Sequence, residues 1–132
     1  MSTFDDSDDF EIYGSDGAEV AEIRVQLRAA LTDAMHERDA AAVAAYRSAL
    51  AALDNAEAVP CDERAGAIED SPGSVGATEA PRRVLTGHEV QYLIAREVDE
   101  REAAAASYDR LGQPDRAQRL RDEADALTPW TT

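Results

Sequence analysis

Two oppositely charged side chains lie within an apolar stripe between Thr86 and Leu111. When this segment is turned 100° per residue, as in an α-helix, Glu97 and Arg101 fall in the middle of one face. The rest of that face is Val90, Leu93, Ile94, Ala104, Ala105, Tyr108 and Leu111. Glu precedes Arg by four residues, which is the favourable order for an ion pair on a helix. We expect these two residues either to form a satisfied pair at a helix interface or to belong to a recognition site.

The segment 40–57 repeats this pattern of charge within an apolar face. Glu57 falls inside its apolar stripe, Arg47 falls at the edge, and Asn55 lies two residues before Glu57. We therefore predict a half-buried polar cluster between helices, made of Arg47, Asn55, Glu57, Glu97 and Arg101. Such a cluster fixes the register of the helices at little net gain in stability, or it binds a partner.

Other residue types that carry chemistry are poorly arranged for it. His36 and His88 lie on different predicted helices, and neither has a second ligand at metal-binding spacing. Cys61 is the one cysteine and lies in an acidic stretch, where a nucleophilic thiolate is not favoured. The glycines near residue 73 lack the Lys-Ser/Thr of a phosphate loop. We predict no catalytic residue, no cofactor and no metal, and leave enzymatic activity open.

The charge of the chain bears on its partners. The formal net charge is −15, and residues 1–19 hold seven acids and no base. A phosphate backbone is bound by basic surfaces, so this balance opposes sequence-independent binding to nucleic acid. Four arginines nevertheless cluster in the last predicted hairpin and form the candidate RNA contact: Arg110, Arg116, Arg119 and Arg121. Aspartates interleaved with them also fit an ordinary mixed-charge surface.

The elements that must position these residues are helices. Apolar periodicity and end signals predict helices at about 17–38, 40–57, 86–111 and 114–127. Asp16 is the expected N-cap of the first and Asp39 of the second, with a tight turn near Arg38. Thr86 and Glu89 form a capping box, and Gly112 ends the third helix. The predicted fold is all-α, with two helical hairpins and a thin, alanine-lined core.

One segment precedes this helical domain of residues 16–132, and another lies within it. Residues 1–15 are acidic and are expected to be a disordered tail, and 58–84 hold prolines and glycines without periodicity, as a long flexible linker does. Apolar runs of membrane-spanning length are missing from the sequence, and the N-terminus is acidic where a signal peptide is basic. We expect a cytoplasmic protein.

Several of these residues, in this order, resemble a known family. Arg38-Asp39, Arg47 and Asn55-Ala56-Glu57 resemble the first hairpin of the YqeY-like proteins, which are related to the tail domain of the Asp/Glu-tRNA amidotransferase B subunit (the GatB/YqeY type). The second half resembles it through Leu85-Thr86, Glu97, Arg101, Tyr108, Gly112, Glu123 and Pro129. The resemblance covers roughly residues 20–130 apart from the linker.

The resemblance implies an all-helical accessory domain and the family label of carbon–nitrogen ligase activity with glutamine as amido-N-donor, linked to tRNA-dependent amidation. The catalytic parts of that complex lie in other chains, so it implies a non-catalytic role here, with tRNA or the amidotransferase as partner. Longer members continue after the equivalent of Pro129 into a further helical bundle associated with tRNA contact. The alternative is an acidic protein–protein adaptor with an unidentified protein partner and no RNA role.

Overall fold

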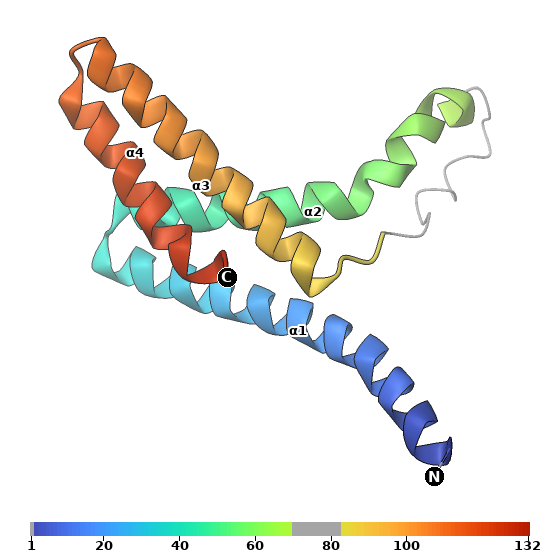
Figure 1. Ribbon diagram of the computed structural model, residues 1–132. Helices are drawn as coiled ribbons and strands as arrows, with labels where there is room; N and C mark the ends of the chain where they lie inside the picture. Colours follow the sequence, from blue (N-terminus) through green and yellow to red (C-terminus); the bar gives the residue numbers. More distant parts are fainter. Residues whose placement is uncertain (1, 70–82) are drawn as a thin grey trace.

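The fold is built from four α-helices, seen in a computed structural model that describes residues 2–69 and 83–132, with side chains described for 17–58 and 83–132. The helices are α1 (Ser2–Glu37), α2 (Ala40–Glu69), α3 (Gly87–Arg110) and α4 (Pro114–Leu127), followed by the short 3-10 helix η2 (Thr128–Trp130). α1 and α2 form one hairpin and α3 and α4 a second, which lies across the first (Figure 1). The predicted all-α fold is confirmed.

A tight turn near Arg38 separates α1 from α2, as the sequence predicts. The Asp39 amide donates to the Ala34 carbonyl oxygen at 2.9 Å, and the Arg38 amide donates to that of Met35 at 3.2 Å. This pair of bonds is the Schellman motif, which satisfies carbonyl groups at a helix end. Arg38 adopts the left-handed conformation that the motif requires, with φ of 58°. The Asp39 carboxylate then accepts a hydrogen bond from the Ala42 amide and caps α2.

The second hairpin uses the end signals that its sequence predicts. The Thr86 hydroxyl accepts from the Glu89 amide and the Glu89 carboxylate accepts from the Thr86 amide, each at 3.0 Å, so the capping box is complete. Gly112, with φ of 75°, ends α3 in a second Schellman motif. Pro114 occupies the first turn of α4, where its missing N–H costs no hydrogen bond.

The core is lined by small residues, as expected from the composition. Among the side chains that the structure describes, seven of the fourteen buried hydrophobic residues are alanines. The buried face of α2 centres on Ala45, Ala49 and Leu53, and it packs with Leu27 of α1 and Ile94 of α3. Because the methyl side chains of alanine allow neighbouring helices to pack closely, polar groups on different helices at the edge of this core lie within hydrogen-bonding distance.

The end of the chain closes the two hairpins on each other. The Trp130 indole nitrogen donates to the Gln26 side chain of α1 at 3.1 Å. Its ring meets Tyr46 of α2 edge-on, with centroids 5.7 Å apart. The C-terminus therefore lies beside α1 (Figure 1).

The helix ends differ from the sequence-based expectation in three places. α1 begins at Ser2, so its backbone includes the segment expected as a tail, and Asp16 lies inside the helix rather than at its start. Acidic residues near a helix N-terminus favour the helix dipole, which is a reason for this extension. α2 continues through Pro60 to Glu69, into the expected linker, while residues 70–82 lie outside the described part. Leu111, expected on the apolar face, is 69% exposed because it lies in the turn after α3.

Candidate functional site

A half-buried ion cluster joins α2, α3 and α4, and Arg101 is its centre. Arg101 Nη1 donates to Glu97 Oε1 at 2.8 Å, and Nε donates to Glu123 Oε1 at 2.9 Å. Ser48 Oγ of α2 donates to Glu97 Oε1 at 2.6 Å. The exposed fractions of the side chains are 13% for Arg101, 16% for Glu97 and 11% for Glu123. We call Ser48, Glu97, Arg101 and Glu123 the Arg101 cluster.

The Arg101 cluster is arranged to hold helices together and not to react with a substrate. One guanidinium bridges two carboxylates, and Arg101 Nη1 also donates to the Glu97 backbone carbonyl at 3.1 Å. Charge-assisted bonds of this kind are stronger than neutral ones, and two of them cross between helices. Because each charged group already faces a partner at bonding distance, a substrate would have to displace an ion pair to reach one.

Glu57 was expected in this cluster and lies elsewhere. It pairs with Arg24 of α1, whose Nη2 is 2.9 Å from Glu57 Oε2, while Arg24 Nη1 is 2.9 Å from Asp54 Oδ1. Burial lowers the pKa of the Arg24 guanidinium, but its bonds with Asp54 and Glu57 outweigh this effect and raise the pKa above the ordinary value. The prediction that Glu57 meets Arg101 is therefore wrong. Glu57 lies nine residues after Ser48, which places it on the opposite side of α2 from the Ser48–Glu97 contact.

Arg47 and Asn55 were also expected in the cluster, and both are exposed on α2. The buried face of α2 centres on Ala45, Ala49 and Leu53. Arg47 lies two residues from Ala45 and from Ala49, and Asn55 lies two residues after Leu53. Two residues correspond to about 200° around a helix, so both side chains point away from the buried face. The predicted five-residue cluster thus divides into Glu97 with Arg101, Glu57 with Arg24, and two exposed side chains.

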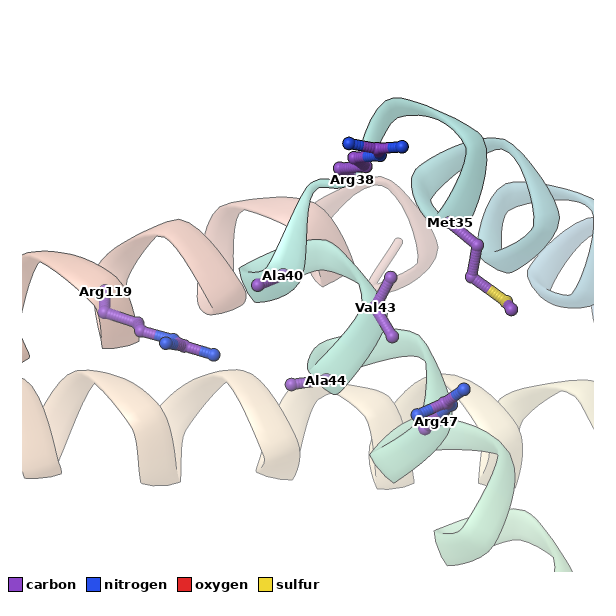
Figure 2. A pocket seen from close by; sticks show the side chains of 7 residues that line it. All are labelled: Met35, Arg38, Ala40, Val43, Ala44, Arg47 and Arg119. Atoms are coloured by element: carbon purple, nitrogen blue, oxygen red, sulfur yellow. The ribbon is translucent and has the colours of Figure 1, made fainter.

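An open groove of about 560 Å³ lies where the first turn and α2 approach α4. Its lining is three arginines and four apolar residues: Arg38, Arg47, Arg119, Met35, Ala40, Val43 and Ala44. Figure 2 shows the arginines around the groove and the alanines between them. We call this feature the arginine groove. Carboxylates are not among its described lining residues.

The four arginines of the candidate RNA contact have local partners on the α3–α4 hairpin. Arg121 pairs with Asp109, and Arg110 donates to the Ser107 hydroxyl at 3.1 Å. Arg116 lies over the Tyr108 ring, 5.7 Å from its centroid. Arg119 Nε is 3.8 Å from Glu123 Oε2, and its side chain also lines the arginine groove. They do not form one free basic surface.

Four residues of these ion pairs and hydrogen bonds were missed as site residues: Arg24, Ser48, Asp54 and Glu123. Glu123 carried the same signal as Glu97, because it lies among the apolar residues Leu120, Ala124 and Leu127 of its helix. Arg24 similarly lies between Ile23 and Leu27 in the sequence of α1. Ser48 had no such signal, since a serine beside alanines is common on any helix.

Within residues 2–69 and 83–132, no group of three or more His, Cys, Asp or Glu side chains is placed to hold a metal ion. None of the described helices combines the length and the apolar character needed to cross a bilayer. No protein-family model matches the chain, and no curated protein matches it.

Proposed function

We propose that this chain is a non-catalytic helical accessory domain that acts by binding, in the cytoplasm and beside tRNA-dependent amidation. The observation that carries the proposal is the closed ion network of Arg101 with Glu97 and Glu123. These three positions belong to the pattern that resembles the YqeY-like proteins. Their contacts connect α3 with α4, which is a structural reason for these residue types. A motif that ties helices together supports a scaffold role.

The glutamine-dependent carbon–nitrogen ligase label then belongs to an assembly in which this chain contributes binding surfaces. The groups that a catalytic chain would use, such as Glu97 and Glu123, are held by Arg101 between helices. A general acid or base must reach the proton that it transfers. Glu123 also lines an open pocket beside Tyr108 and Arg119, but its carboxylate accepts a hydrogen bond from Arg101 there.

A second candidate is an acidic protein–protein adaptor without an RNA role. It is favoured by the net charge of −15 and by the Arg121–Asp109 pair, which neutralises one of the four candidate RNA-contacting arginines. Affinity for a phosphate backbone grows with the number of phosphates neutralised, so each internal pair lowers it. Both candidates share a binding role and differ in the partner.

Affinity capture distinguishes them. The tagged full-length chain is recovered from a lysate of the cell that produces it, and RNA and protein are identified together, with Arg116→Glu/Arg119→Glu as the matched variant. Enrichment of tRNA or amidotransferase subunits supports the amidation role. One protein partner without RNA supports the adaptor. If neither RNA nor protein is captured, the amidation proposal is contradicted.

The non-catalytic part has its own test. The purified chain is incubated with glutamine and ATP, and released glutamate is measured. We expect release at the rate of the protein-free control. Sustained release that is lost in Glu123→Gln would overturn the proposal.

A further inference from the structure

Two of the three arginines in the arginine groove have their charge unmatched. Arg38 and Arg47 make no ion pair or side-chain hydrogen bond with the residues that the structure describes, and the nearest carboxylate to Arg119 is at 3.8 Å. This local positive surface lies on a chain with a net charge of −15. Guanidinium groups bind carboxylates and phosphates through paired N–H donors, so the groove is suited to an anionic ligand.

The backbone of Arg38 supports a role for its side chain. Arg38 occupies the left-handed position of a Schellman motif, where glycine is the usual residue. An L-residue there costs roughly 1 kcal/mol. Glycine would avoid this cost but would remove one of the three cations from the groove. Strained residues of this kind gather at binding sites.

The shape of the groove indicates an extended ligand. The three guanidinium groups come from the first turn, α2 and α4, and they lie around the groove instead of converging on one point (Figure 2). The surface between them is apolar, and Met35 is 51% exposed there. A ligand that fits carries several separated negative charges with apolar groups between them, as an acidic peptide segment does.

We propose that the arginine groove binds the acidic N-terminal segment, residues 1–16, of a second copy of this chain. That segment has six acids and no base. Its aromatic and aliphatic residues lie among the acids and match the apolar floor: Phe4, Phe10, Ile12 and Tyr13. The inference goes beyond the proposed amidation role and does not depend on it.

The segment must come from another copy because of the length of α1. α1 is one helix from Ser2 to Glu37 (Figure 1), with the acidic segment at its start. The groove lies at its other end, where Met35 and Arg38 line it. At 1.5 Å per residue, about 30 residues of helix separate the two by roughly 45 Å. Two copies that exchange segments reciprocally form a closed dimer with two equal contacts.

Long-range repulsion between two acidic copies sets the conditions of the test. At about 0.15 M salt the Debye length is roughly 8 Å, so repulsion between distant charges is screened. Whether the two copies associate then depends on the close contacts in the groove. Sedimentation velocity of the full-length chain at this salt concentration is the measurement. The groove variant is Arg38→Glu/Arg47→Glu, and the segment variant replaces Asp5, Asp6, Asp8 and Asp9 by Asn. The control Arg96→Glu/Arg110→Glu has the same charge change as the groove variant.

We expect the wild-type chain and the control to dimerise, and each of the other two variants to dimerise at least about tenfold more weakly. Mixing the groove variant with the segment variant restores association, because one supplies an intact segment and the other an intact groove. This rescue also shows that both variants are folded.

Three results overturn the proposal: a wild-type chain that stays monomeric, a groove variant that dimerises like the control, or a mixture without association. Titration with inorganic tripolyphosphate is the parallel arm. Tripolyphosphate binding that is lost in the groove variant, without self-association of the wild-type chain, assigns the groove to a phosphate ligand and overturns the inference. Failure here leaves the affinity-capture result for amidation partners unaffected.

Discussion

Arg38 occupies in the first hairpin the same backbone position that Gly112 occupies in the second. Each is the left-handed residue of a Schellman motif, with φ of 58° and 75°. The amide of the next residue donates to the carbonyl five positions back in both: Asp39 to Ala34, and Gln113 to Tyr108. The turn after α3 thus has glycine, the residue with the lowest conformational free energy in the left-handed region, whereas the turn after α1 has an arginine.

This relationship predicts that Arg38→Gly stabilises the fold. Removing the left-handed strain gains about 1 kcal/mol, and the added freedom of glycine in the unfolded chain returns part of it. We expect a net increase of about 0.5 kcal/mol in the free energy of unfolding, measured by urea titration with circular dichroism. The same variant should weaken dimerisation in sedimentation velocity. A loss of stability would show that the Arg38 side chain makes a contact that holds the turn.

Gly112→Ala and Gly17→Ala are expected to act in opposite directions. A Cβ at either position has open space around it, so only the backbone conformation decides. At Gly112 the left-handed φ makes alanine cost about 1 kcal/mol. At Gly17, inside α1, alanine has the higher helix propensity and gains up to about 1 kcal/mol. Thermal unfolding of both variants checks this, and a destabilised Gly17→Ala would contradict helical backbone at that position.

Arg101→Ala is expected to lower the free energy of unfolding by about 2–4 kcal/mol. The substitution leaves the Glu97 and Glu123 carboxylates half-buried without their counter-ion, which is the costly way to break an ion pair. Arg96→Ala is the matched control, because Arg96 makes an exposed pair with Glu100 four residues away on the same helix. We expect the control to cost under about 0.5 kcal/mol. Equal effects would show that the Arg101 cluster contributes no more than a surface pair.

Glu89 predicts the pH dependence of the second hairpin. The Thr86 amide donates to the Glu89 carboxylate and lowers its pKa below 4.5; partial burial opposes this, and nearby Arg83 adds to it. Because the pKa is lower in the folded state, the stabilisation is present above pH 4.5 and is lost as pH falls through the folded-state pKa. Glu89→Gln should flatten the fall in stability below pH 4.5. Carboxyl NMR titration giving Glu89 a pKa above 4.5 would contradict this.

The features that sequence alone predicts here are local. The capping box of Thr86 and Glu89 and the stop at Gly112 depend on residues within one turn of each other, and both are present. The pair of Glu97 and Arg101 was predicted for the same reason. Each of these depends on helix geometry, which a periodic sequence specifies.

Contacts between helices were harder to predict because they depend on helix rotation. The bond from Ser48 to Glu97 spans 49 positions, and Arg24 reaches Asp54 across 30. A rotation of α2 by one residue, about 100°, decides whether Arg47 or Ser48 faces α3. The larger residues Val43 and Tyr46 are only partly buried, whereas the small residues Ala45 and Ala49 are fully buried and allow the closest packing.

Arg101 stabilises the fold, whereas Arg38 and Arg47 are available for binding, and one urea titration separates these two roles. Arg101→Ala and Arg38→Glu/Arg47→Glu are unfolded side by side with the wild-type chain. We expect the Arg101 variant to lose about 2–4 kcal/mol of unfolding free energy, because it leaves two carboxylates unpaired, and the groove variant to change by under about 0.5 kcal/mol. A groove variant destabilised as much as the Arg101 variant would show that the arginine groove is part of the structural framework and would contradict its assignment as a binding surface.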